Sequence, residues 1–420
     1  MIIIESALIA FVCSALLIPL VIRSCKKHGW YDSTNERKIH KGNIPRLGAV
    51  GFIPASIIGC VFFCLTYPEA RPLEYIPLAI SAFIIFFFGV LDDFIEMRAK
   101  KKLAVQIIAT LLILLSGKTF KTIGSIAIPA PVSYGLTFLW IAGMINAFNL
   151  IDGVDGLCGG LSAIILSTLG IIYLHTSPTM AAFCFVIASG IAGFLLYNKP
   201  KAKIFMGDGG SQTLGFLIAA LPLYNSASGF ETNKAFSMVL LTCIPVIDTV
   251  AAMIRRAREH RSFFSPDKAH LHHKLMNVGL NSVQILLLLL SIQAVLCAVV
   301  ASSLLLDNTK AVVLICSVWF IVLGAFIMLH YYNRKILQKQ KEVEDGADYA
   351  SLNIAMAQGA SVARVASMIT PPRTSQNLTK VFSIIRKGSL LGYSLSGKPF
   401  LYHRKKNYAE RILPSLIFMT

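Results

Sequence analysis

The chain has 420 residues, of which 55% are hydrophobic and only 14% charged, whereas an ordinary soluble domain is about 25% charged. This composition excludes a typical soluble protein. The net charge of +18 is attributed to basic cytoplasmic loops that lie beside anionic lipid, so no nucleic-acid partner is expected. Most of the nine cysteines lie in apolar stretches without paired metal-binding spacing, which favours small buried side chains.

Apolar stretches of the length that crosses a bilayer, about 20 residues, recur up to residue 332. They predict eleven transmembrane helices, at residues 2–22, 47–66, 75–91, 103–117, 131–148, 159–175, 180–197, 212–224, 235–254, 283–304 and 311–332. The first stretch lacks a basic leader and a cleavage site, so it is predicted to be a retained span. The predicted fold is an all-α, polytopic integral membrane protein.

Lys and Arg gather in alternate loops between these spans. Loops that an outside N-terminus would place in the cytoplasm hold twenty of them, and the opposite loops hold five. Because cytoplasmic loops carry the excess of Lys and Arg, the N-terminus is predicted outside and the C-terminus inside. Removing one weak span would spoil this asymmetry, which supports the count of eleven.

Two adjacent carboxylates, Asp92 and Asp93, close the third predicted span in the sequence L-D-D-F. Neighbouring carboxylates repel each other and are costly to desolvate at a membrane boundary. They are predicted to act as a base or to help hold a cation. The alternative is a solvated helix end beside the lysines at 100–102.

The fifth span ends in N-A-F-N-L-I-D-G-V-D-G-L. Asn146, Asn149 and Asp152 recur every three residues, so they form one polar stripe on a helix end, and Asp155 follows. The glycines after each Asp end the helix and allow close approach of a ligand. Oxygen ligands of this kind suit a hard cation such as magnesium, although a plain polar loop is the alternative.

A glycine-rich turn, F-M-G-D-G-G-S, precedes the eighth span. Gly207 and Ser211 flank a helix start whose backbone N–H groups could bind a phosphate, and Asp208 could hold a metal that bridges to it. Glycine turns are common between spans, so the prediction depends on Asp208.

The ninth span is followed by Arg255 and Arg256 and then by P-D-K-A-H-L-H-H-K. His272 and His273 are neighbours and cannot share a helix face, and no metalloprotease glutamate follows, which argues against zinc. Together with His270 and the arginines they are predicted to bind an anion such as a diphosphate. A merely basic loop is the alternative.

All four clusters fall at the predicted cytoplasmic ends of spans. They supply carboxylates for a divalent cation, a turn for one phosphate and a cationic loop for another. This combination indicates metal-assisted phosphoryl transfer between a cytosolic substrate and a lipid held between the spans.

Residues 333–420 differ in kind from residues 1–332, which form the predicted transmembrane transferase domain. A charged stretch at 334–348 is predicted to be helical, and a mixed Ser, Gly and basic segment follows. The interpretation is a partly disordered cytoplasmic tail of unknown role.

The four motifs, in this order and spacing, resemble those of the polyprenyl-phosphate N-acetylhexosamine-1-phosphate transferase family over residues 1–332. A fifth family-like stretch, R-K-I-H-K-G-N-I-P-R-L-G, ends at Gly48, with Ala49 in place of the usual second glycine. The form S-P-D-K-A-H-L-H-H resembles the branch that uses UDP-N-acetylglucosamine (UDP-GlcNAc), since the muramoyl-pentapeptide branch has contiguous histidines.

This resemblance implies a bacterial inner-membrane enzyme with a cytoplasmic active site that transfers GlcNAc-1-phosphate to undecaprenyl phosphate, releases UMP and initiates a cell-envelope glycan. It implies Mg²⁺, with Mn²⁺ as a substitute, and a homodimer is compatible with such a bundle. The residue roles that it implies are Asp208 and Asn149 as metal ligands, Asp92 and Asp93 beside the lipid phosphate, Asp152 and Asp155 orienting nucleotide or metal, and His270, His272, His273, Arg255 and Arg256 gripping the donor diphosphate.

Three alternatives stay open at this point. The donor could be another UDP-N-acetylhexosamine. The transfer could pass through an aspartyl intermediate at Asp92 instead of direct attack on the β-phosphorus. A transporter of lipid-linked sugars is the rival from another class, but its polar groups would lie near the midplane on broken helices, often with an internal repeat.

Overall fold

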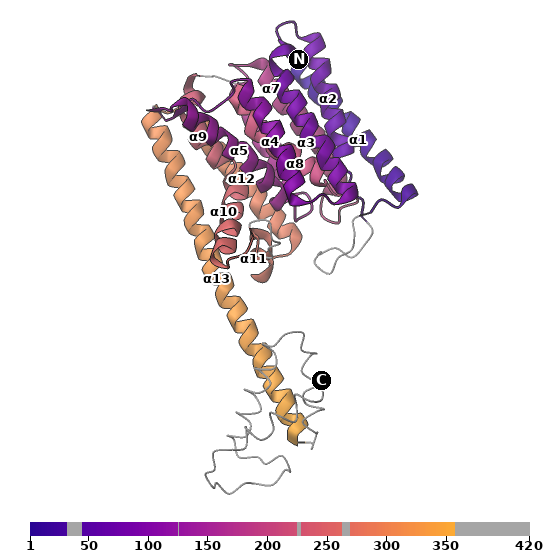
Figure 1. The fold of residues 1–420 in the computed structure, drawn as a ribbon, viewed down its shortest axis with the longest axis vertical. Coiled ribbons are helices and arrows are strands. Elements are labelled where there is room, and N and C mark those ends of the chain that lie inside the picture. Colours follow the sequence, from indigo (N-terminus) through magenta and orange to yellow (C-terminus); the bar gives the residue numbers. More distant parts are fainter. Residues whose placement is uncertain (32–43, 125, 225–227, 263–268, 358–420) are drawn as a thin grey trace. The chain divides into compact units, whose positions relative to one another are not determined.

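A computed structural model describes residues 1–31, 44–124, 126–224, 228–262 and 269–357, and these are mostly helical (Figure 1). The α-helices are α1 (Ile2–His28), α2 (Ala49–Thr66), α3 (Ile76–Ile95), α4 (Ala99–Leu115), α5 (Ala130–Ile151), α6 (Leu157–Tyr173), α7 (Pro178–Asn198), α8 (Asp208–Ala220), α9 (Ser228–Leu241), α10 (Cys243–Arg258), α11 (Leu271–Asn277), α12 (Ser282–Ser303) and α13 (Asn308–Ala357). The chain divides into two units, Met1–Asn333 and Arg334–Thr420.

Every predicted span falls on an α-helix, and the range 235–254 falls on two α-helices, α9 and α10. Among the described residues, seven helices are long and apolar enough to cross a membrane, or up to eight if the bent pair α9–α10 is one span. The predicted spans at 103–117, 159–175 and 212–224 correspond to the shorter helices α4, α6 and α8.

The predicted span over 235–254 falls on a bent pair of helices, because the helix axis turns by 79° between α9 and α10. Pro245 lies in the first turn of α10 and has no N–H, so it cannot donate to the carbonyl of Leu241 four residues earlier. Gln293 of α12 supplies the missing donor: its Nε2 lies 2.8 Å from the Leu241 oxygen, in a buried position.

A small β-ribbon also departs from the all-α prediction. Strand β1 (Thr122–Ile123) pairs antiparallel with β2 (Ile126–Ala127), in the connection between α4 and α5. Two residues in each strand are too short for the alternating pattern that would have revealed them.

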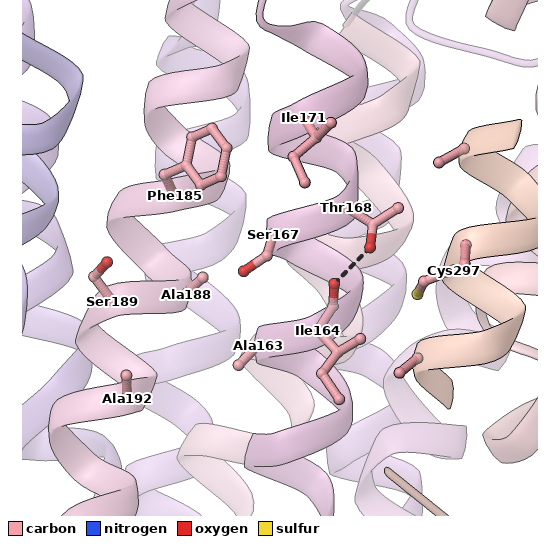
Figure 2. A pocket seen from close by; sticks show the side chains of 13 residues that line it. Ala163, Ile164, Ser167, Thr168, Ile171, Phe185, Ala188, Ser189, Ala192 and Cys297 are labelled. Atoms are coloured by element: carbon pink, nitrogen blue, oxygen red, sulfur yellow. Dashed lines mark hydrogen bonds between the residues drawn. The ribbon is translucent and has the colours of Figure 1, made fainter. Parts of the chain in front are cut away.

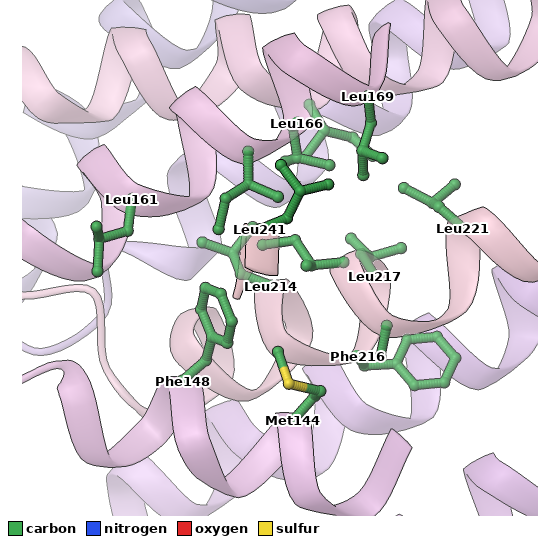
Figure 3. Close-up of a cluster of buried hydrophobic side chains, with 14 of the residues drawn as sticks. Met144, Phe148, Leu161, Leu166, Leu169, Leu214, Phe216, Leu217, Leu221 and Leu241 are labelled. Carbon is green, nitrogen blue, oxygen red and sulfur yellow. The ribbon is translucent and has the colours of Figure 1, made fainter. Parts of the chain in front are cut away.

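Helix α8 lies at the centre of the Met1–Asn333 unit. It packs between α3 and α5 and also contacts α2 and α6, and every residue from Asp208 to Ala220 is buried. Figure 3 shows its apolar side chains meeting Met144 and Phe148 of α5 and the leucines of α6. The core therefore fixes the position of Asp208, the first residue of α8.

An apolar cavity of about 530 Å³ lies between α6, α7 and α12 (Figure 2). Most side chains that line it are small, such as Ala163, Ala188 and Ala192, and Cys297 faces it from α12. The Thr168 hydroxyl on this wall donates to the Ile164 carbonyl at 2.9 Å, so it is satisfied within its own helix.

Helix α13 continues without a break from Asn308 to Ala357, which confirms the helix predicted over 334–348. The rest of the predicted tail, residues 358–420, lies outside the described residues, as does most of the stretch from Arg37 to Gly48. The cytoplasmic location and role of 333–420 stay predictions.

Candidate active site

The N-terminus of α8 is held by a carboxylate from α3. Asp93 accepts the N–H groups of Asp208 at 2.8 Å and Gly209 at 3.1 Å, where the helix dipole favours a negative charge. Gly207 precedes the helix at φ 78°, and a Cβ there would collide with the Asp93 carboxylate and the Arg46 carbonyl. Two of the N–H groups predicted to face a phosphate are thus bound by Asp93.

Two cations that the sequence interpretation did not single out neutralise this cluster. Arg46 Nη2 lies 3.2 Å from Asp208 Oδ1 and 3.4 Å from Asp93 Oδ1. Lys102 Nζ lies 2.9 Å from Asp208 Oδ2 and also forms an ion pair with Asp92. Their only sequence signals were the P-R-L-G of the fifth motif and the lysines that follow L-D-D-F.

A chain of amide hydrogen bonds leads from the predicted stripe on α5 to Asp208. Asn146 donates to Gln106 Oε1 at 2.9 Å, Gln106 Nε2 lies 3.4 Å from Gln212 Oε1, and Gln212 donates to Asp208 Oδ2 at 3.2 Å. Gln106 and Gln212 are buried polar residues in apolar helices, a signal that could have been read from the sequence.

The other residues of the stripe lie beside α8. Asn149 Oδ1 accepts from the Ser211 hydroxyl at 3.0 Å, so these two predicted site residues are in contact. Asp152 ends α5. Desolvation and, to a smaller extent, the charge of Asp208 together raise the pKa of the Asp152 carboxyl to about 7, while Arg46 opposes this rise. The Asp152 carboxyl is therefore electrostatically coupled to the α8 cluster.

Asp155 is buried and faces the segment that leads into α8. Its Oδ2 accepts the N–H of Ala202 at 3.0 Å. Nearby, Asn198 accepts from Gly156 N at 2.9 Å and donates to the Ile204 carbonyl at 2.8 Å. These bonds tie the D-G-V-D-G turn to the loop that positions Asp208.

The histidine motif forms the start of α11. His270 and His272 have nearly parallel rings, with centroids 6.1 Å apart, and the His272 and His273 centroids lie 4.2 Å apart. On α10, Arg256 is buried and Arg255 is half-buried. The stretch 263–268 that joins these helices lies outside the described residues.

His272 links this motif to the turn after α5. A Cβ on Gly153 would lie only 2.5 Å from the His272 Cε1 atom, so the ring rests on the backbone next to Asp152. Burial lowers the pKa of His272 to about 4, the neighbouring His273 adds to this, and Asp248 opposes it. At neutral pH His272 is therefore an uncharged ring, and its binding of the donor diphosphate stays a prediction.

The chemistry of the cluster fits a divalent cation. It holds four carboxylates and two fixed cations: Asp92, Asp93, Asp152, Asp208, Arg46 and Lys102. When all four acids are ionised, two negative charges are uncompensated, and the donors are the hard oxygens that magnesium prefers. Within the described residues no three His, Cys, Asp or Glu side chains are arranged as a metal site, and the Lys102 amine pairs with two of the carboxylates, Asp92 and Asp208.

Comparison with known proteins agrees with the family that the sequence motifs resemble. A model of glycosyl transferase family 4 matches residues 75–226. The probable undecaprenyl-phosphate N-acetylglucosaminyl 1-phosphate transferase of Bacillus subtilis (strain 168) is 34% identical over 283 residues, 65% of this chain and 78% of that protein. The undecaprenyl-phosphate alpha-N-acetylglucosaminyl 1-phosphate transferase of Escherichia coli (strain K12) is 31% identical over 304 residues, 69% and 80% of the two chains.

Proposed function

The chain belongs to glycosyl transferase family 4, and from this membership we propose that it transfers GlcNAc-1-phosphate from UDP-GlcNAc to undecaprenyl phosphate. The observation that carries the proposal is the cluster at the start of α8, where Asp208 meets Arg46 and Lys102. Fixed cations beside carboxylates suit a reaction that depends on positioning and on neutralising phosphate charge.

The proposed step is a direct displacement. An oxygen of the lipid phosphate forms a bond to the β-phosphorus of the donor, the bond from that phosphorus to the bridging oxygen breaks, and UMP leaves. Asp92, in the last turn of α3, would face the lipid phosphate. Because phosphate monoesters have a second pKa near 6, the acceptor is largely ionised at neutral pH and needs little help from a base.

Asp93 has a different role in this proposal. Its side chain is fully buried and bound to two N–H groups and Arg46. Asp93 therefore holds α8 in place and is not proposed to react with either substrate. Both aspartates are therefore required, but only Asp92 is proposed to meet substrate. This arrangement also disfavours an aspartyl intermediate, since Asp92 is engaged by Lys102 and the N–H of Met97.

Asp208 and Asn149 are the residues proposed to hold Mg²⁺, with Mn²⁺ as a substitute. Bound there, the ion would neutralise charge on the donor diphosphate. Asp152 and Asp155 would keep the turn after α5 in register with Asp208, and His270, His273, Arg255 and Arg256 would bind the donor phosphates. His272, which is neutral, would pack beside them.

The membrane arrangement that we propose for this reaction has eleven spans. In this proposal α4, α6 and α8 cross the bilayer with the seven longer helices and the bent α9–α10 pair. The N-terminus would lie outside the bacterial inner membrane and the active site at its cytoplasmic face, where UDP-sugars are made. Residues 1–332 would form the transferase domain and residues 333–420 a cytoplasmic tail. A homodimer is compatible with this arrangement.

Release of UMP by purified protein in detergent tests the function. Wild-type protein with UDP-GlcNAc, undecaprenyl phosphate and Mg²⁺ is expected to release UMP, and omission of lipid or addition of EDTA should abolish it. Asp208→Asn should be inactive, and Asp307→Asn, at an exposed acid paired with Lys310, should match wild type. Turnover with a different UDP-N-acetylhexosamine alone would change the substrate, and folded protein that releases no UMP from any donor would refute the proposal.

A further inference from the structure

A buried carboxylate on α10 grips the start of the histidine motif. Asp248 is 1% exposed. Its Oδ2 lies 2.9 Å from His270 Nδ1, and its Oδ1 accepts the N–H of Leu271 at 2.7 Å. The same carboxylate thus holds the ring of His270 and the first N–H of α11.

The position of Asp248 on α10 points to the same site. Asp248, Ala252 and Arg256 are spaced by four residues and are all buried, so they share one face of the helix. That face carries the carboxylate that binds His270 and the arginine proposed to bind donor phosphate. The sequence interpretation overlooked Asp248 because a single acid in I-P-V-I-D-T-V has no motif around it.

The geometry assigns the ring nitrogens of His270. A carboxylate can only accept, so Nδ1 is the protonated nitrogen that donates to Asp248. Within the described residues Nε2 has no hydrogen bond, which leaves it as the atom that can meet a ligand. When Nε2 also carries a proton and donates to a phosphate oxygen, the carboxylate of Asp248 balances the positive charge of the ring.

His270 differs in this respect from its neighbour in the motif. Among the described residues no carboxylate is hydrogen-bonded to His272 and its Nδ1 lacks a hydrogen-bond partner, and burial keeps its ring neutral. The rings of His270 and His272 are stacked, and His272 rests on Gly153. The stack therefore connects the ring held by Asp248 with the turn next to Asp152.

We propose that Asp248 is a positioning residue that holds the ring of His270 by its Nδ1–H, so that Nε2 is the nitrogen that meets the diphosphate of the nucleotide-sugar. The proposal rests on the proposed function, since it assigns one contact to the donor of that reaction. The competing explanation is that Asp248 only anchors α11 through Leu271.

The variant Asp248→Asn separates these explanations. Its amide oxygen can still accept the N–H of Leu271, but its NH₂ group would donate to His270 Nδ1, so Nδ1 could no longer carry a proton and the ring could not become positively charged beside the diphosphate. We expect about tenfold weaker UDP binding by titration calorimetry and a similar rise in KM for the donor, as when a charge-assisted hydrogen bond from Nε2 becomes a neutral one. The KM for undecaprenyl phosphate and the thermal midpoint should stay at wild-type values.

His270→Gln and the double variant complete the test. His270→Gln should weaken UDP binding to a similar degree, and Asp248→Asn should add no further loss in its presence, because both changes remove the same contact. Asp307→Asn serves as the matched control. The proposal would be overturned if Asp248→Asn bound UDP with wild-type affinity, or if the two losses of UDP affinity multiplied in the double variant. It would also be overturned if Asp248→Asn raised the KM for both substrates and lowered the thermal midpoint.

The binding measurement also keeps this proposal distinct from the proposed function. If wild-type protein binds UDP but releases no UMP, only the proposed function is refuted. The comparison of UDP affinities would still decide the role of Asp248. Wild-type protein that does not bind UDP would overturn both.

Discussion

The imidazole of His272 rests on the backbone of Gly153, with room for no side chain between them. Two motifs more than a hundred residues apart therefore meet at a glycine that the sequence presents only as a helix end. The contact places the α11 segment next to Asp152, and its disruption should be felt by the nucleotide-sugar more than by the lipid.

We predict that Gly153→Ala raises the KM for UDP-GlcNAc by about tenfold, because the added methyl group displaces His272 and the residues around it. The KM for undecaprenyl phosphate should change little. Steady-state UMP release with each substrate varied in turn measures both. Gly143→Ala is the control, since a Cβ at Gly143 meets nothing within 4 Å. Equal effects of the two changes would contradict the contact.

Loss of the Lys102 amine should reduce activity more than loss of the amine of the neighbouring Lys101. Lys102→Met removes the ion pairs to Asp92 and Asp208, and we expect kcat/KM to fall by at least about 100-fold, as when a preorganised charge is removed from a reaction centre. Lys101→Met, at an exposed position on the same helix turn, should keep near wild-type activity. Comparable activity of both variants would remove Lys102 from the site.

The buried His272 predicts a pH dependence of stability. Its pKa of about 4 in the folded protein lies below the ordinary value near 6.5. The unfolded chain therefore binds a proton first as the pH falls, and the folded state should lose about 3 kcal/mol between pH 6.5 and 4 from this residue. Above pH 6.5 the effect should vanish.

Thermal unfolding of His272→Gln across this pH range tests the sign. Its stability should fall less steeply toward pH 4 than that of wild type, because the glutamine has no proton to gain. His260→Gln, at an exposed histidine, should follow the wild-type curve. Parallel curves for all three proteins would show that His272 is not buried as a neutral ring.

The hydrogen bond across the α9–α10 break can be measured by a double-mutant cycle. Gln293→Leu leaves the Leu241 carbonyl without its donor and should lower the free energy of unfolding by about 1–2 kcal/mol. Pro245→Ala restores a backbone N–H in α10, so Gln293→Leu should cost less in that background. An equal cost in both backgrounds would show that Gln293 does not compensate for the N–H that Pro245 lacks.

Sequence reasoning located the helices because an apolar run of sufficient length has few alternatives in a bilayer. It located Asp92, Asp93, Asp208 and Asn149 because glycines and carboxylates are conspicuous between apolar spans. It missed Arg46 and Lys102, whose shared partner Asp208 lies 162 and 106 residues away, and Asp248, which has no motif around it. It also treated the three histidines alike, whereas burial of His272 and the contact of His270 with Asp248 give them different chemistry.

The side-chain bond between Gln293 and Leu241 also has a consequence for the order of biogenesis. The two residues are 52 positions apart, so the bent segment leaves the ribosome before its donor exists. An unsatisfied carbonyl in hydrocarbon costs several kcal/mol, which favours retention of the α9–α10 segment at the membrane surface or beside the translocon until α12 arrives. The face of α10 that carries Asp248 and Arg256 would then be among the last parts of the enzyme to reach its final depth in the membrane.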